Sequence, residues 1–330
     1  MREANVTPRC LADDLMITAT GHGHLTRTVK GMTLSRAFFQ DIGAKVADKK
    51  CFCFASDKPT RSFLAKYDWD GQGLHIPVTS SFRDIGTHVN LTSTNNGKTL
   101  TDRMSKARFS TNRLTWLPLP LELKQKIVQA NILPAGLYGC EAAWVNKSCL
   151  KAFRAAVANA LGPRSNRASN EVVFHNTTTS KELDPSTYIL LQRVLTLRRT
   201  LSKYPERIAQ ARSIIGKYNK ELLCNPTANI ISIPQGPVAL LMHSLDECGA
   251  TLRDFFNIIQ PSEPNVDIWN MPWQHLKQAI MDIVIRHRTK QTATQRTFID
   301  NLQEIDRPII NSLLDKMGDK ERNVYRYVAT

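Results

Sequence analysis

The chain has 330 residues, 42% of them hydrophobic and 22% charged, and carries a formal net charge of +15 from 44 Lys and Arg against 29 Asp and Glu. No apolar run reaches the roughly 20 residues of a membrane span, the N-terminus lacks the apolar core of a signal peptide, and the seven scattered cysteines argue against a disulfide framework. We therefore expect a folded intracellular protein, nuclear or cytoplasmic and not secreted, with a polyanionic partner and no membrane contact.

The first predicted element is a tight β-hairpin around Asp13 and Asp14. The two carboxylates lie between short apolar runs, Cys-Leu-Ala before them and Leu-Met-Ile after them. Asp tolerates the backbone conformation of a two-residue hairpin turn, and the apolar flanks suit half-buried strands. Carboxylates beyond the end of a sheet are hard oxygen ligands that suit Mg²⁺. On these residues alone, a solvent-exposed acidic turn without chemistry is the alternative.

The rest of the region up to residue 97 is expected to mix one helix with short strands. The helix is predicted over residues 25–42, with Gly43 as its C-cap. Its apolar face consists of Leu25, Val29, Met32 and Phe39. Strand-forming residues dominate the segments 45–55, 74–78 and 82–91. An Asn-Asn-Gly turn closes the region at Gly97.

Beyond residue 98 the sequence predicts helices separated by prolines. They are expected at 101–116, 121–133, 148–161, from 185 onward, 238–248, 273–288 and 292–317. Pro134 is expected to end the second helix, and Asp184 with Pro185 to begin the fourth as N-cap and first helical residue. Residues 164–180 are expected to form a polar loop. The predicted inward positions are Met104, Ala107, Thr111 and Leu114, then Leu123, Ile127 and Ala130, and finally Leu190, Val194, Leu197 and Leu201.

Most of the positive charge lies in the middle of the chain. Residues 102–217 hold 19 Lys and Arg against 7 Asp and Glu, which gives +12 of the total +15. The basic residues expected to lie on exposed helical faces and to bind nucleic acid are Arg103, Lys106 and Arg113, followed by Arg193, Arg198, Arg199 and Lys203. Such faces can follow a phosphate backbone, with binding that weakens as salt rises. A solvated face that only keeps the protein soluble is the alternative.

Five short motifs in a fixed order carry a family resemblance. After the acidic hairpin and its helix come Gly-Ala-Lys-Val-Ala-Asp-Lys-Lys at residues 43–50 and Phe-Arg-Asp-Ile-Gly-Thr-His-Val at 82–89. Arg-Met-Ser-Lys-Ala follows at 103–107, and Leu-Pro-Ala-Gly-Leu-Tyr-Gly at 133–139. Over residues 9–200 this order resembles the C-terminal part of a reverse transcriptase of the non-LTR retrotransposon type. Leu11 stands where that family has an aromatic residue before Ala-Asp-Asp.

The resemblance implies an α+β fold in three parts. Residues 1–97 would be a partial polymerase palm of β-hairpin, helix and short strands. Residues 98–217 would be a basic, mostly α-helical thumb, and residues 218–330 a helical C-terminal extension. A template–primer duplex of RNA and DNA would be the partner, with dNTP as the substrate of the intact enzyme.

The resemblance also implies roles for individual residues. Asp13 and Asp14 would be catalytic metal ligands in an intact enzyme that holds two Mg²⁺ ions, and Lys50 would lie near the incoming triphosphate as a catalytic residue. Residues 82–89 would form a primer-grip-like hairpin with Ile85 and Gly86 at its turn, which would support the 3′ end of the primer. An exposed lysine without a role is the alternative for Lys50.

The third metal-binding aspartate and the fingers of that family lie upstream of the acidic hairpin, where this sequence has only a dozen residues. We therefore expect weak or no Mg²⁺ binding and no polymerase activity from this chain alone. A truncated reverse transcriptase is the leading hypothesis. The alternatives are a non-enzymatic nucleic-acid-binding remnant and a helical interaction module whose positive charge is incidental.

Overall fold

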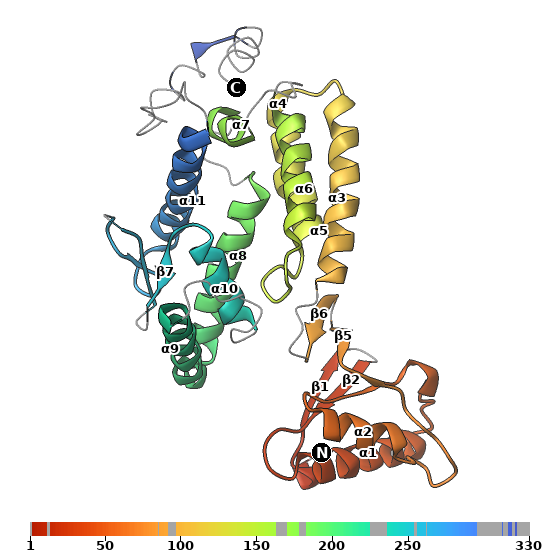
Figure 1. Ribbon diagram of the computed structural model, residues 1–330. Coiled ribbons are helices and arrows are strands. Elements are labelled where there is room, and N and C mark those ends of the chain that lie inside the picture. Colours follow the sequence, from red (N-terminus) through yellow and green to blue (C-terminus); the bar gives the residue numbers. More distant parts are fainter. Residues whose placement is uncertain are drawn as a thin grey trace. The chain divides into compact units, whose positions relative to one another are not determined.

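The computed structural model describes residues 2–11, 14–84, 86–91, 97–162, 170–177, 183–224, 236–253, 256–261, 263–295, 312, 316–318 and 321. It is a mixed α+β fold dominated by helices, with small sheets (Figure 1). The α+β class expected from the sequence is therefore confirmed. The chain divides into two compact units, residues 1–82 with 90–92, and residues 83–89 with 93–330.

Unit 1 is built around the acidic hairpin and the helix that follows it. Strand β1 (Thr7–Leu11) pairs antiparallel with β2 (Asp14–Thr18), and Leu11 lies opposite Asp14. Helix α1 (His24–Asp41) packs against this hairpin at Gly31, where a Cβ atom would lie 3.1 Å from Val6 Cγ2. The absence of a side chain at Gly31 therefore allows the close approach of the hairpin.

The predicted end of α1 is confirmed by its backbone geometry. Gly43 has φ +71°, and its N–H donates to Gln40 O, while the N–H of Ala44 donates to Phe39 O. These two bonds form a Schellman motif, which requires a left-handed residue at the position that Gly43 occupies.

The rest of unit 1 contains fewer strand residues than the sequence predicts. In the 45–55 segment only β3 (Cys53–Phe54) is a strand, and Asp48–Lys50 form a 3₁₀ turn. β3 pairs in parallel with β4 (Val78–Thr79), so most of the expected 74–78 strand is irregular. Helix α2 (Lys58–Lys66) was not expected from the sequence. Asp57 caps it by accepting from the Thr60 N–H, and Leu64 joins a small core with Trp69 and Ile76.

Strands β5 (Ser81–Asp84) and β6 (Thr87–Asn90) pair in a two-stranded sheet, in agreement with the hairpin expected over residues 82–89 and in place of a single strand over 82–91. The division between the two units falls inside this hairpin, between Phe82 and Arg83. The Asn-Asn dipeptide of the predicted turn at Gly97 lies outside the described residues.

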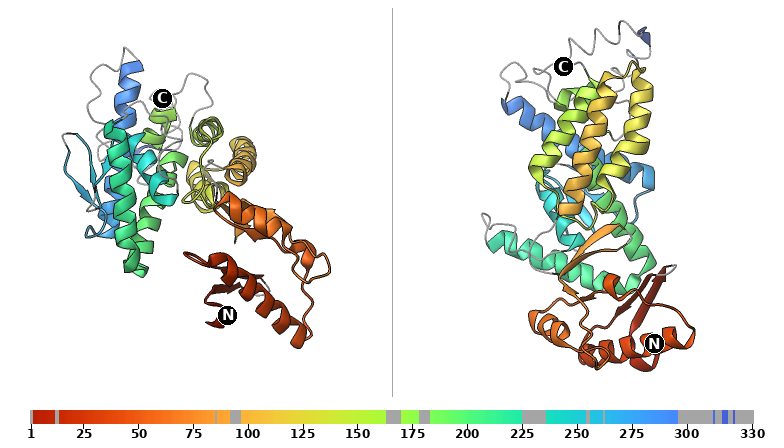
Figure 2. Two further views of the ribbon diagram at one scale, coloured as in Figure 1. Left: turned by 60° about the horizontal axis from the view of Figure 1, so that its bottom comes forward. Right: turned by 90° about the vertical axis from the view of Figure 1, so that its right-hand side faces the viewer.

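Unit 2 contains two neighbouring helical clusters (Figure 2). The first has α3 (Lys98–Trp116), α4 (Leu121–Ile127), a π-helical stretch (Val128–Ile132), α5 (Leu133–Leu137), α6 (Lys147–Leu161) and α7 (Asn170–Thr177). The second has α8 (Pro185–Lys203), a 3₁₀ turn (Pro205–Arg207), α9 (Ile208–Cys224), α10 (Pro237–Asp246), the sheet of β7 (Thr251–Leu252), β8 (Asn257–Ile259) and β9 (Val266–Asp267), and α11 (Trp273–Gln295). The start of α8 contacts the first core and its middle the second.

Several predictions in unit 2 are confirmed, because their signals are local. Asp184 accepts a hydrogen bond from the Ser186 N–H and so caps α8 as expected. The leucine stripe of α8 is buried, and so are the four predicted inward positions of α3. The predicted helices at 148–161, 238–248 and 273–288 correspond to α6, α10 and α11.

Pro134 does not end its helix as predicted. The chain passes from α4 through the π-helical stretch into α5, which has Pro134 in its first turn. The Leu133 N–H donates to Val128 O, five residues back, which is the hydrogen bond of a π-helix. This wider turn comes directly before Pro134, which has no N–H to donate. Of the predicted inward positions, Ile127 is partly buried against the core, but Leu123 and Ala130 are exposed, and Val128 and Ile132 are buried instead.

Two further expectations for unit 2 differ from the structure. Residues 170–177 form α7 within the predicted loop at 164–180. The boundary expected between residues 217 and 218 falls inside α9, whose Ile215 and Tyr218 share one core with α10 and α11. The predicted helix at 292–317 lies largely outside the described residues, although α11 extends to Gln295.

Candidate nucleic-acid interface

Helix α3 exposes a row of alternating basic and aromatic side chains. Lys106, Phe109, Arg113 and Trp116 follow one another at spacings of three, four and three, which places them on one face of the helix. Phe109 is 65% exposed and Trp116 is 73% exposed, whereas large aromatic side chains are usually buried. We call these four residues the α3 stripe. The whole helix carries five Lys or Arg against one acid, Asp102.

The opposite face of α3 explains why the stripe is exposed. Leu100, Met104, Ala107 and Leu114 lie in the core between α3, α5 and α6. Gly136 of α5 approaches α3 closely, because a Cβ atom there would lie 2.5 Å from the Ala107 Cβ. Burial of the apolar face fixes the rotation of the helix, so the other face is turned to solvent.

Arg103 joins the primer-grip-like turn to the start of α3. Its Nη2 donates to Gly86 O at 2.5 Å and its Nη1 to Tyr138 O at 2.8 Å, while its guanidinium lies 5.0 Å from the centre of the Tyr138 ring. Gly86 has φ +76°, and a Cβ atom there would lie 3.2 Å from Arg103 Nη2. Two motifs distant in sequence thus meet around one guanidinium. Arg103 acts as a structural link, not as part of the exposed face predicted for it.

Arg193 was also expected on an exposed basic face, and that prediction is wrong. Its side chain is only 5% exposed. The guanidinium donates to Cys140 O at 3.1 Å, Ala143 O at 3.1 Å and Leu240 O at 2.9 Å, and to the Ser244 hydroxyl. It therefore joins the loop after α5 to α10, and it cannot reach a phosphate backbone.

Arg198, Arg199 and Lys203 lie near the C-terminal end of α8. Arg198 is half-buried and donates to Met271 O at 2.7 Å, so its position is structural as well. Arg199 and Lys203 are exposed, as predicted for a basic face. Lys203 and Arg207 lie 5.4 and 5.3 Å from the centre of the Tyr204 ring, which forms a second exposed basic and aromatic group.

The acidic hairpin does not form a metal site among the described residues. Asp14 is exposed at the start of β2, and Asp13, like Ile85 of the predicted primer grip, lies outside the described residues. In the part of the chain that the structure describes, no group of three His, Cys, Asp or Glu residues could hold a metal ion. Lys50 is exposed at the end of the 3₁₀ turn.

Sequence reasoning identified Lys106 and Arg113 but missed Phe109 and Trp116. The signal was available, because two aromatic residues interleave with two basic ones at helical spacing. An apolar residue at such a spacing more often faces a core, and only the packing of α3 excludes that here.

None of the helices in the described ranges combines the length and the apolar character that a membrane span requires. Comparison with known proteins adds no relative, because no family model, curated protein or solved structure matches the chain.

Proposed function

We propose that the protein binds nucleic acid through the α3 stripe, with a template–primer duplex of RNA and DNA as its ligand. The observation that carries the proposal is the exposed row of Lys106, Phe109, Arg113 and Trp116. Lysine and arginine neutralise phosphates, and exposed aromatic rings stack on unpaired bases or contact sugars. Because α3 holds five basic residues against one acid, its charge is complementary to a nucleic-acid backbone.

We further propose that the chain derives from a reverse transcriptase of the non-LTR type. The order of five sequence motifs supports this origin. So does the arrangement around Arg103, where the turn at Gly86 and the Leu-Tyr-Gly segment ending at Gly139 meet. Polymerase chemistry at Asp13, Asp14 and Lys50 stays a prediction of the resemblance.

The test is a binding titration with a labelled RNA–DNA heteroduplex that carries a single-stranded overhang, measured by fluorescence anisotropy over a range of salt concentrations. The Lys106→Gln/Arg113→Gln variant removes two positive charges from the stripe. If both residues contact phosphates, the slope of log affinity against log salt falls in magnitude by about 2.

The matched control is Lys217→Gln/Lys220→Gln, which removes the same charge from exposed positions on α9. An equal loss of affinity in both double variants would show that net charge alone attracts the ligand. Absence of any binding at low salt would refute the proposal and leave the helical interaction module.

The aromatic half of the stripe is tested separately with Phe109→Ala/Trp116→Ala. Loss of stacking costs about 1–3 kcal/mol per base, so affinity for the overhang substrate falls at least about fivefold while the salt slope is unchanged. A blunt duplex lacks unpaired bases and is expected to lose less. Unchanged affinity for both substrates would show that Phe109 and Trp116 do not contribute to binding.

A further inference from the structure

Unit 2 contains a cavity of about 410 Å³ between α6, α8, α10 and α11. Its size is within the range of pockets that enclose small organic ligands. Each of these helices contributes apolar side chains to the lining, which includes Leu150, Ile189, Leu190, Leu240 and Val284. This cavity is separate from the α3 stripe, because no residue of α3 lines it.

Basic side chains outnumber acidic ones around the cavity. Five Lys or Arg and two Glu line the cavity. Asp184 forms ion pairs with two of these arginines, so five positive charges stand against three negative ones, a net charge of +2. Three of the cations, Lys147, Lys151 and Arg154, recur at spacings of four and three along one face of α6. Lys147 forms an ion pair with Glu247, with 2.7 Å between Nζ and Oε1, whereas Lys151 is exposed and has no ion-pair partner among the described residues.

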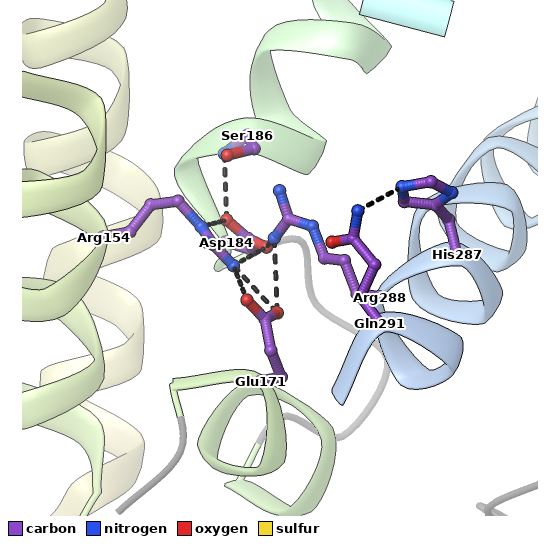
Figure 3. A network of polar contacts seen from close by, with 7 residues as sticks. All are labelled: Arg154, Glu171, Asp184, Ser186, His287, Arg288 and Gln291. Carbon is purple, nitrogen blue, oxygen red and sulfur yellow. Dashed lines mark hydrogen bonds and ion pairs between the residues drawn. The ribbon is translucent and has the colours of Figure 1, made fainter. Parts of the chain in front are cut away.

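The arginines at the inner end of the cavity are held rigidly. Arg154 Nε donates to Asp184 Oδ1 at 2.8 Å and its Nη2 to Glu171 Oε2 at 2.9 Å (Figure 3). Arg288 of α11 contacts the same two carboxylates from the other side. Each carboxylate is thus shared by two arginines, and the guanidinium groups are pre-organised by their partners.

A buried histidine in the same cavity lacks one hydrogen-bond partner. His243 is 7% exposed, and its ring stacks on Trp144 with centroids 5.2 Å apart. Its Nε2 lies 3.5 Å from Glu247 Oε1, whereas its Nδ1 has no hydrogen-bond partner among the described residues. Because Nδ1 is fully buried, it is not open to a ligand in the cavity, and His243 contributes to the lining through its ring, which is stacked on Trp144.

We propose that this cavity binds a phosphate-bearing organic anion of mononucleotide size. The α6 cations Lys147, Lys151 and Arg154 attract the phosphate, and the apolar side chains of the lining together with the stacked rings of Trp144 and His243 accommodate the organic part. A free nucleotide and the terminal nucleotide of a bound strand share this chemistry.

The test uses isothermal titration calorimetry of the full chain with AMP, adenosine and a short single-stranded oligoadenylate that ends in a phosphate. AMP is expected to bind at least about tenfold more tightly than adenosine, because hydrogen bonds to charged groups contribute roughly 1.5–3 kcal/mol. Competition by the oligoadenylate would identify a strand end as the source, and its failure to compete would identify a free nucleotide. Equal binding of AMP and adenosine, or no binding of AMP at millimolar concentration, would overturn the proposal.

The variant Lys151→Glu tests the cationic wall, because Lys151 is exposed and lies outside the arginine–carboxylate network. We expect it to weaken AMP binding at least about tenfold. The control Lys220→Glu makes the same change on α9, away from the cavity, and is expected to bind AMP as the wild type does. Equal affinities of the two variants would refute the assignment. The Lys106→Gln/Arg113→Gln variant is expected to keep AMP binding, so this proposal and the duplex proposal fail independently.

Discussion

Arg193→Met is expected to destabilise unit 2 strongly, because the Arg193 side chain is buried and hydrogen-bonded. Methionine is similar in length to the aliphatic part of arginine but lacks the guanidinium. That group donates hydrogen bonds to Cys140 O, Ala143 O, Leu240 O and the Ser244 hydroxyl. Each buried acceptor left without a donor costs about 1–3 kcal/mol. Burial lowers the pKa of Arg193, which shows that the cation itself is held at a desolvation cost, and its removal returns part of the loss. We expect a net destabilisation of about 3–5 kcal/mol.

Urea unfolding followed by tryptophan fluorescence measures this loss, and a melting temperature lower by about 10 °C is the corresponding thermal change. Arg199→Met on the same helix is the control, because Arg199 is exposed, and its effect is expected to stay within about 0.5 kcal/mol. If the two variants unfold at the same urea concentration, Arg193 does not hold the loop after α5 against α10. The same result would favour the prediction from the sequence, in which Arg193 lies on an exposed basic face.

Burial raises the pKa of Asp184, but the neighbouring arginines lower it more, so the pKa falls from 3.8 to about 2. This carboxylate therefore stabilises the fold above pH 4 by about 2 kcal/mol, and that contribution is lost as the pH falls through 2. Acid unfolding of Asp184→Asn should lack this pH-dependent loss. Gly86→Ala should cost about 1–2 kcal/mol in urea unfolding, because φ is +76° and the new methyl group meets Arg103, and an unchanged midpoint would contradict that geometry. In Gly43→Ala the new methyl group meets no atom within 4 Å, so only the positive φ of +71° makes the substitution unfavourable. We expect it to cost about 1 kcal/mol of stability, measured as faster amide exchange at the end of α1.

The features that the sequence predicted correctly depend on neighbours in the chain. The acidic pair between apolar runs predicts a hairpin, Gly43 predicts the end of α1, and Asp184 before a proline predicts the start of α8. In each case the relevant hydrogen bonds join residues within a few positions of one another. Local backbone preference and short-range capping therefore suffice to identify them.

Only the tertiary structure decided which charged residues are available to a partner. Arg193 and Arg199 lie on the same helix, yet Arg193 is buried because Cys140 and Leu240, each about 50 residues away, pack against its side. The stripe with Lys106 is exposed because α5 and α6 cover the other face of α3. The sequence alone specifies the number and spacing of the charges, whereas their exposure depends on segments that come together only when the core packs. The cavity beside α6 arises in the same way, from four helices distant in the chain.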